Sequence, residues 1–426
     1  MLYGREGMEL SVPDSAVILE PSHAPVLPDP IDAIRRALRA PVGSAALPAL
    51  LAERKPRSVA ITISDITRPV PNALILAALL EQLNGAGVAD AQVTIIVGTG
   101  MHRPSTSEEL RELVGPEVLS RCRIVDHRAD DAGSLVRLCD DPPVSLNALF
   151  AQADFRIVTG LIEPHFMAGF SGGRKGVCPA LVDLATVQRF HGYATLSDAR
   201  SANGVIEGNP CHAESLRIAR LVGVDFLVNV AINKSRQVCG VYAGDMERAH
   251  EIGVADVARW TSACVEADFD LIVTCGGGYP LDQTFYQTVK GIVGALPACH
   301  DRSVVLIASH CGQGIGSASY SQIMQTWAHD WRGFLHHIAG AGVAQKDQWN
   351  AQLQCRVLER IGQQRLWLAS DGLPIDIQAK LWVTPVTGEG SAQARCQRAM
   401  DDFIRECPEA RVAVAPDGPY TMLRRI

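Results

Sequence analysis

The 426-residue chain lacks the features that mark several large classes of protein. Its 39 basic residues are outnumbered by 46 acidic ones, so no basic surface is expected to neutralise nucleic-acid phosphates. Apolar runs such as Ala73–Leu80 fall far short of the roughly 20 residues that a membrane-spanning helix needs. The first ten residues contain early charges and no apolar segment of the secretory type. We therefore expect a cytoplasmic protein that binds neither nucleic acid nor membrane.

The sequence also lacks any C-x-x-C pair, although it contains 12 cysteines. Neighbouring cysteines are never closer than 11 positions apart, which excludes the basic unit of zinc ribbons, ferredoxins and thioredoxins. Without a secretory signal, disulfides are not expected. The cysteines are therefore interpreted as reduced and mostly buried small apolar residues.

What the sequence does contain is a repeated order of strand, loop and helix. Three segments rich in apolar and β-branched residues are predicted as strands: Arg57–Ser64, Gln92–Val97 and Phe155–Thr159. A helix is predicted over Ala73–Leu83, and Ser105 with Glu108 has the spacing of a capping box at the start of another. This alternation predicts an α/β fold with mainly parallel sheets, in which ligands bind at the carboxyl ends of the strands.

The alternation restarts near Thr261–Asp268 and predicts a second α/β domain. Its expected elements are strands Leu271–Cys275 and Ser303–Ser309, a long helical stretch Trp331–Ile361 broken at Gly340–Gly342, and a strand and turn over Val412–Thr421. Asp282 is a candidate N-cap for the helix after the first of these strands. We expect domains over residues 1–264 and 265–400, with 401–426 as a tail that can pack back on the first domain.

Two glycine-rich loops resemble nucleotide-binding motifs only superficially. Gly98–Arg103 has arginine where a dinucleotide fingerprint needs its third glycine, and Gly169–Gly176 lacks the Ser or Thr that follows lysine in a Walker loop. The second loop can still bind an anion, because its glycines expose backbone N–H groups and Arg174 and Lys175 add charge. A flexible surface loop is the alternative, disfavoured by the apolar residues that follow.

Isolated polar residues near these loops are ambiguous when taken singly. Arg68 can clamp a carboxylate, but it can equally form a turn salt bridge with Asp65. Apolar residues three positions apart predict a helix between Lys175 and His191, with His191 near its end. His165 and His191 are 26 residues apart, so only the fold could bring them to one metal.

In order and spacing, these segments together resemble the nickel-pincer-nucleotide-dependent lactate racemase family, from about residue 57 to 420. The segments that carry the resemblance are DITRP with Asp65 and Arg68, GTGMHRP with His102, EPHFMAG with His165, SGGRKG with Lys175, QRFHG with His191, and YQTVKG with Tyr286, Gln287 and Lys290. GNPCHAE at 208–214 and YAGD at 242–245 are further similar segments.

The resemblance implies a nickel cofactor attached to Lys175. This cofactor is pyridinium-3-thioamide-5-thiocarboxylic acid mononucleotide, the nickel-pincer nucleotide, and His191 would be the protein ligand of its nickel. A set of soft sulfurs with one imidazole in a plane suits nickel(II) on general grounds. Arg68, Gln287 and Lys290 would bind the substrate. Gln287 and Lys290 would also contact the cofactor, with Asp65 and Tyr286 as further contacts.

The resemblance also implies a reaction, the racemisation or epimerisation of a 2-hydroxy acid. Hydride would leave the substrate α-carbon for the cofactor while His102 or His165 takes the hydroxyl proton, which gives a 2-keto acid and avoids a carbanion. The site is expected in the cleft between the two domains. Cofactor-assembly enzymes would load the chain, which is a candidate homo-oligomer.

Two other functions remain open at this stage, a nickel-pincer-nucleotide binding protein without catalysis and a zinc-dependent hydrolase that uses three histidines. The hydrolase lacks a closely spaced histidine pair. The substrate is also open, among lactate, malate, 2-hydroxyglutarate, phenyllactate and sugar acids. His310 and Gln313 either meet a distal substrate group or belong to a hydrogen-bonded glycine loop.

Overall fold

The structure is a computed structural model that describes residues 1–22 and 24–425. Its chain forms two compact units. Unit 1 comprises the described residues of Met1–Ser22, His191–Ala199 and Trp260–Ile426, and unit 2 those of His23–Phe190 and Arg200–Arg259. The predicted α/β class and two-domain organisation are confirmed.

Unit 2 is built on a six-stranded sheet in the order β11-β10-β7-β2-β3-β4, in which only the β10–β11 pair is antiparallel. Its strands are β2 (Val59–Ser64), β3 (Val93–Gly98), β4 (Arg123–Asp126), β7 (Phe155–Leu161), β10 (Phe226–Ile232) and β11 (Val238–Gly244). The central strands are buried nearly throughout, as expected of a parallel sheet with both faces covered. Two short hairpins accompany the sheet: β5 (Leu135–Asp140) with β6 (Pro143–Asn147), and β8 (Pro164–His165) with β9 (Gly169–Phe170).

The helices that begin in unit 2 are α1 (Pro30–Arg39), α2 (Leu47–Arg54), α3 (Asn72–Gly85), α4 (Ser107–Arg121), α5 (Ala148–Ala151), α6 (Leu184–Phe190), α8 (Pro210–Val222) and α9 (Met246–Thr261). Helix α4 begins one residue later than predicted. Thr106 accepts from the backbone N–H of Glu109 and the Glu109 carboxylate accepts from the Thr106 N–H, so the capping box is Thr106–Glu109. Both candidate boxes have the required spacing, but Ser105 bonds the Asp126 carboxylate instead.

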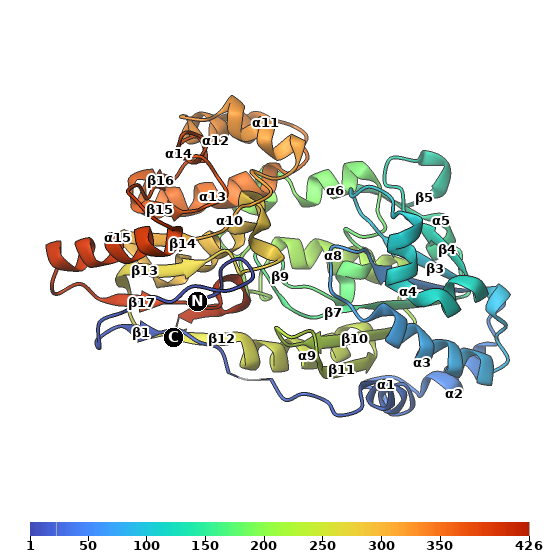
Figure 1. Cartoon of the computed structure of the whole chain (residues 1–426). Coiled ribbons are helices and arrows are strands. Elements are labelled where there is room, and N and C mark those ends of the chain that lie inside the picture. Colours follow the sequence, from blue (N-terminus) through green and yellow to red (C-terminus); the bar gives the residue numbers. More distant parts are fainter. Residues whose placement is uncertain (23, 426) are drawn as a thin grey trace. The chain divides into compact units, whose positions relative to one another are not determined.

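Unit 1 contains a second six-stranded sheet, wholly parallel, in the order β1-β17-β13-β14-β15-β16. Its strands are β1 (Val17–Ile18), β13 (Phe269–Cys275), β14 (Cys299–Ala308), β15 (Leu366–Ala369), β16 (Thr384–Pro385) and β17 (Val412–Val414). Figure 1 shows the N-terminal β1 beside the C-terminal β17. A separate parallel pair joins β12 (Ser262–Val265) to β18 (Met422–Arg425).

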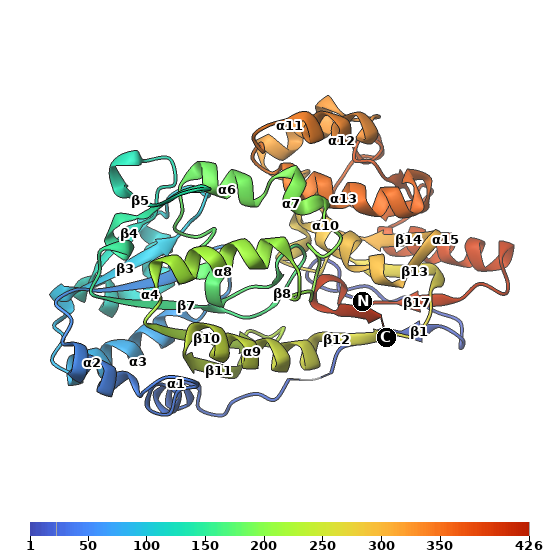
Figure 2. The same cartoon turned by 180° about the vertical axis from the view of Figure 1, so that it is seen from behind.

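The helices of unit 1 are α7 (Tyr193–Ser197), α10 (Phe285–Gly294), α11 (Ala318–Thr326), α12 (Trp331–Gly340), α13 (Gln348–Ile361), α14 (Ile375–Gln378) and α15 (Ala392–Glu406). Helix α7 lies beside α13 (Figure 2). The predicted break at Gly340–Gly342 separates α12 from α13. The predicted N-cap Asp282 is wrong, because Thr284 caps α10 and the Asp282 carboxylate accepts from the backbone N–H groups of Gly4 and His310.

The unit boundaries differ from the predicted ranges in three places. Residues 1–22 and 191–199 belong to unit 1, although both were assigned to the first domain. The C-terminal residues belong to unit 1 as well, because β17 pairs with β13 and β18 with β12. These pairings join segments far apart in the chain, so no local sequence pattern predicts them.

Nine of the 12 cysteines are buried and all 12 are free, which agrees with their interpretation as small apolar residues. No helix within residues 1–22 and 24–425 has the length and apolar character needed to cross a membrane.

Candidate active site

Three loops at one edge of the unit 2 sheet carry four of the predicted site residues. Asp65 and Arg68 follow β2, His102 follows β3, and His165 follows β7. Strands β7, β2 and β3 are parallel neighbours, so their carboxyl ends share an edge. At about 4.8 Å between strands, the ends of β3 and β7 are about 10 Å apart, with the end of β2 between them. The candidate residues that follow these three strands therefore lie at the same edge of the sheet.

His102 is hydrogen-bonded to the buried carboxylate of Asp65, with Nδ1 2.6 Å from Oδ2. The other carboxylate oxygen accepts from the backbone N–H and the hydroxyl of Thr67, at 3.2 and 2.5 Å. Burial alone would raise the pKa of Asp65, but the hydrogen bonds from His102 and Thr67 outweigh it and hold the pKa below its usual value. An ionised carboxylate only accepts, so His102 carries its proton on Nδ1 and presents Nε2 as a base.

His165 is held in the opposite tautomer. It is buried in the short β8–β9 hairpin, and its Nδ1 accepts from the backbone N–H groups of Met167 and Ala168, at 3.4 and 3.3 Å. The neutral ring therefore carries its proton on Nε2. The hairpin requires Gly169, which has a φ of +74° and where a Cβ would lie 2.2 Å from the Val205 carbonyl oxygen. The two predicted acid/base histidines thus differ in which ring nitrogen is protonated.

Arg68 forms an ion pair with Glu163 rather than with Asp65. The Arg68 and Glu163 side chains are each about one-third exposed, at 33% and 31%. The backbone of Glu163 is fixed by Ser171, which donates to its carbonyl oxygen at 2.9 Å, while the Ser171 hydroxyl accepts from the Glu163 N–H at 3.0 Å. The Arg68 guanidinium, the predicted carboxylate clamp, is therefore already in contact with one carboxylate of the protein.

Lys175 lies in a single helical turn, Gly173–Gly176, next to the buried Arg174. Burial first, then the positive charges of Arg68 and Arg174, lower the pKa of Lys175 to about 7. Arg174 itself donates to the backbone carbonyls of Ala168 and Phe170, at 2.8 and 2.9 Å. An amine that is substantially neutral near pH 7 is a competent nucleophile, as covalent attachment to a cofactor requires.

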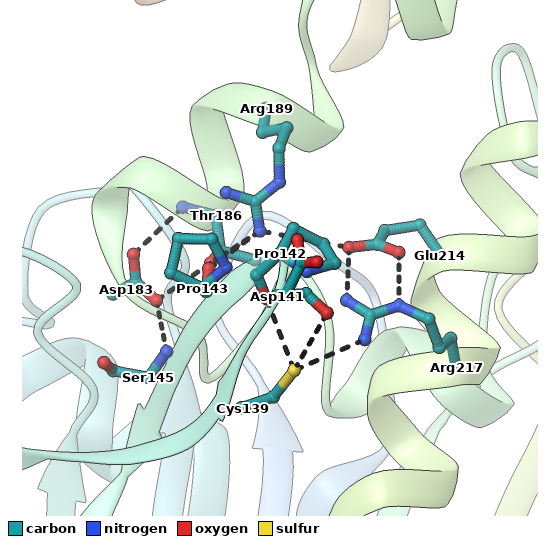
Figure 3. Close-up of polar contacts among 10 residues, drawn as sticks. All are labelled: Cys139, Asp141, Pro142, Pro143, Ser145, Asp183, Thr186, Arg189, Glu214 and Arg217. Carbon is teal, nitrogen blue, oxygen red and sulfur yellow. Dashed lines mark hydrogen bonds and ion pairs between the residues drawn. The ribbon is translucent and has the colours of Figure 1, made fainter.

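Helix α6, which leads to His191, is tied to strand β6 by side chains (Figure 3). The Asp183 carboxylate accepts from the Ser145 N–H at 2.6 Å and from the hydroxyl and N–H of Thr186, at 2.8 and 3.0 Å. In the last turn Arg189 donates to the Pro143 carbonyl at 3.0 Å. The helix ends at Phe190, so the prediction that His191 lies near its end is confirmed.

His191 itself belongs to unit 1, where its ring lies 4.5 Å from that of Trp349, centre to centre. Tyr286, Gln287 and Lys290 lie on α10 of the same unit. The Tyr286 ring meets Tyr320 edge-on at 5.0 Å, and Asn350 of α13 donates to the Tyr286 carbonyl at 2.6 Å. The predicted residues thus fall into two groups, one in each unit.

The residues of the two groups fit the implied cofactor on two counts. Lys175 has the lowered pKa that attachment needs. The side-chain oxygen of Gln287 is buried and has no hydrogen-bond partner among the described residues, so it can accept from a polar group of a ligand. In the described part of the chain no group of three or more His, Cys, Asp or Glu side chains could hold a metal ion. A metal whose other ligands come from a cofactor is compatible with that arrangement.

His310 and Gln313 lie in a loop that is itself hydrogen-bonded. The Cys311 N–H donates to the Asp282 carbonyl at 2.7 Å, and the Gln313 N–H donates to the Gln283 carbonyl at 2.8 Å. The His310 ring contacts Tyr3 at 5.7 Å. These bonds hold the backbone of the loop, whereas His310 Nδ1 is buried and has no hydrogen-bond partner among the described residues, so both interpretations of the loop stay open.

Sequence reasoning missed several residues that the structure brings to these groups. Glu163 was visible two positions before His165 at the end of a strand, yet its pairing with Arg68 joins residues 95 positions apart. Trp349, Gln352 and Arg356, which contact the His191–Ala199 segment, had no signal beyond their place in a helix.

Comparisons with known proteins identify the family to which the chain belongs. Residues 3–204 match the model of the lactate racemase N-terminal domain, and residues 264–419 match that of the lactate racemase C-terminal domain. The lactate racemase of Thermoanaerobacterium thermosaccharolyticum is 30% identical over 398 residues, covering 92% of this chain and 90% of the relative. That of Lactiplantibacillus plantarum is 31% identical over 392 residues, covering 91% and 89%.

Solved structures show the same likeness. The lactate racemase apoprotein from T. thermosaccharolyticum superposes with a TM-score of 0.89 at 27% identity, covering 100% of this chain and 99% of that one. A Thermotoga maritima protein of 16% identity has a TM-score of 0.65, covering 93% and 98%, and shows likeness of fold alone. With both family domains matched across most of its length, the chain belongs to the lactate racemase family and is an isomerase of the racemase type.

Proposed function

We propose that this chain racemises a 2-hydroxy acid, with lactate as the first substrate to test because its relatives are named lactate racemases. In this proposal His102 and His165 are the acid/base pair, Lys175 carries the nickel-pincer nucleotide, and His191 binds its nickel. Two α/β units and an exposed arginine clamp suit a small carboxylic acid.

The unit 2 residues perform the proton transfers in this proposal. Arg68 holds the substrate carboxylate through the N–H groups that Glu163 does not occupy. His102 accepts the hydroxyl proton at Nε2, and the Asp65 carboxylate stabilises the resulting imidazolium. The Nε2–H of His165 donates a hydrogen bond to the oxygen that becomes the carbonyl. When hydride returns to the other face of the planar carbon, the His102 imidazolium gives its proton back to this oxygen, which completes the racemisation. The bound nickel-pincer nucleotide supplies the acceptor that lets the α-carbon lose its hydrogen as hydride and become planar.

In this proposal the unit 1 residues bind and orient the cofactor and the substrate. Gln287 offers its unpartnered oxygen to a donor on the cofactor, and Lys290, one turn further along α10, adds a positive charge for substrate or cofactor oxygens. Tyr286 is fixed between Tyr320 and Asn350 and forms an apolar contact for the cofactor ring. The role of each of these residues is part of the proposal.

The observation that carries the proposal is the pair of histidines that follow β3 and β7 at one sheet edge, one with its Nδ1 bonded to a carboxylate and the other with its Nδ1 accepting from backbone N–H groups. The test is co-expression with cofactor-assembly enzymes, followed by chiral chromatography of enantiopure lactate. We expect racemisation, a mass adduct on Lys175 and near-stoichiometric nickel. Racemisation by protein that carries neither adduct nor nickel would refute the proposal.

A double variant separates catalysis from cofactor binding. His102→Ala with His165→Ala should keep the adduct and the nickel while turnover falls by about 10²-fold or more. Unchanged turnover would show that other groups transfer the protons. If the wild-type protein holds cofactor but racemises none of lactate, malate, 2-hydroxyglutarate, phenyllactate or gluconate, a carrier function replaces the proposed one.

A further inference from the structure

The segment His191–Ala199 interrupts unit 2 in the sequence but belongs to unit 1. It begins at the proposed nickel ligand and contains the short helix α7. A five-residue helix is not stable by itself in water, because the free-energy cost of nucleation exceeds the stabilisation from the few hydrogen bonds of one turn. Something in unit 1 must therefore hold this segment in place.

Helix α13 supplies the contacts that hold it (Figure 2). The side-chain amide of Gln352 donates to the Tyr193 carbonyl at 3.1 Å and to the Ser197 hydroxyl at 3.2 Å. Arg356 donates to the Leu196 carbonyl and, at 3.1 Å, to the Asp198 carbonyl. The two carbonyls that Arg356 contacts lie at the C-terminal end of α7, where the last turn of a helix leaves carbonyl groups for side chains to bond.

Trp349 completes a row of three contacts on one face of α13. Positions 349, 352 and 356 follow the i, i+3, i+7 spacing, which places them on the same side of a helix. The Trp349 ring lies 4.5 Å from the His191 ring, with 33° between the planes. Gln352 is only 5% exposed, so its two hydrogen bonds are made in a site from which water is largely excluded.

We propose that Gln352 and Arg356 are positioning residues for His191. By fixing α7 to α13 they hold the His191 imidazole in one orientation, so that nickel retention depends on residues that touch neither metal nor cofactor. This inference rests on the proposed function, in which His191 is the nickel ligand. Attachment through Lys175, in the other unit, does not depend on these contacts.

The chain offers a matched control on the same helix. Gln354 is also a buried glutamine of α13, and its amide donates to a carbonyl, that of Leu381, at 2.7 Å. Gln352→Leu and Gln354→Leu therefore both remove a buried side-chain amide that donates to a backbone carbonyl, but only the first is expected to loosen the His191–Ala199 segment. Arg356→Gln is a second test variant that leaves α13 free of a new buried apolar group.

Two measurements test the proposal. In cofactor-free protein, amide hydrogen exchange over residues 191–199 should be at least about 10-fold faster in Gln352→Leu and Arg356→Gln than in wild type or Gln354→Leu. In loaded protein, both test variants should keep the Lys175 adduct mass, while a chelator removes nickel about 10- to 100-fold faster than from the control.

Each outcome has one meaning. Exchange and nickel release equal to those of Gln354→Leu overturn the inference. If Gln352→Leu does not fold, Arg356→Gln alone decides it by the same two readouts. If His191→Ala keeps its nickel, or wild type carries no adduct, the proposed function fails, while the exchange result still reports whether α13 holds the segment.

Discussion

Asp65→Asn tests directly whether the Asp65 carboxylate determines the tautomer of His102. In the native chain one carboxylate oxygen accepts from two groups of Thr67, while the other accepts from His102 Nδ1. An amide at this position has only one oxygen. Since Thr67 presents two donors, the oxygen stays there and the NH₂ faces His102. His102 Nδ1 must then accept, which moves the ring proton to Nε2 and blocks the proposed base.

The expected loss of activity in Asp65→Asn can be worked from the hydrogen bond to His102 that is changed and from the tautomer of His102 that results. A hydrogen bond to a charged group is worth about 1.5–3 kcal/mol, which corresponds to about 10- to 150-fold in rate. A wrong tautomer costs up to about 10⁴-fold in the serine-protease triad, where the histidine is enclosed. The His102 side chain is 54% exposed and can reorient more freely, so we expect kcat/KM to fall by about 100-fold.

The assay is racemisation of enantiopure lactate, begun from each enantiomer, with the Lys175 adduct and nickel measured on the same sample. Because the enantiomers have equal free energies, kcat/KM must fall by the same factor in both directions, which checks the data internally. Asp154→Asn, which alters a carboxylate bonded to the backbone of Arg57 and Ser58 beside the start of β7, is the control. A loss below about 3-fold with full cofactor loading would refute the reasoning.

Three further predictions concern charge. Glu163→Gln should lower KM for lactate several-fold, because it removes the negative charge that competes with the substrate carboxylate for Arg68, while stability to urea falls by less than about 1 kcal/mol because the pair is partly exposed; an unchanged KM would contradict the proposed substrate contact of Arg68. In cofactor-free protein, labelling of Lys175 by an amine reagent, followed by peptide mass spectrometry, should rise with a midpoint near pH 7, and Arg68→Gln should move the midpoint upward because a repelling charge is gone; an unmoved midpoint would contradict this. The lowered pKa of Asp65 stabilises the fold above its unfolded pKa of about 3.9, and this contribution is lost as pH falls through the lower folded pKa. The deficit in urea stability of Asp65→Asn should therefore be full at pH 6 and vanish at lower pH; a deficit independent of pH would point to lost packing instead.

Local patterns predicted the elements that position the site. The apolar strands and the loops at their carboxyl ends placed Asp65, His102 and His165 at one edge, because the rule for parallel sheets needs only element order. Errors arose where two local solutions were equivalent. Overlapping capping boxes at Ser105 and Thr106 differ only in what else the hydroxyl can bond. Asp282 is predicted as a cap, but its carboxylate accepts from the backbone N–H of Gly4 and Thr284 caps the helix instead.

By itself the sequence determined the alternating elements, the loops that carry the candidate chemistry and the family resemblance, because these depend on periodicity, turn residues and the order of short motifs. Only the tertiary structure decided the partners. It paired Arg68 with Glu163 and Asp65 with His102, and it assigned His191 to unit 1, whereas Lys175 belongs to unit 2. Hydrogen bonds and ion pairs of this kind join residues tens or hundreds of positions apart, and their choice depends on which strands become neighbours, which no local pattern encodes.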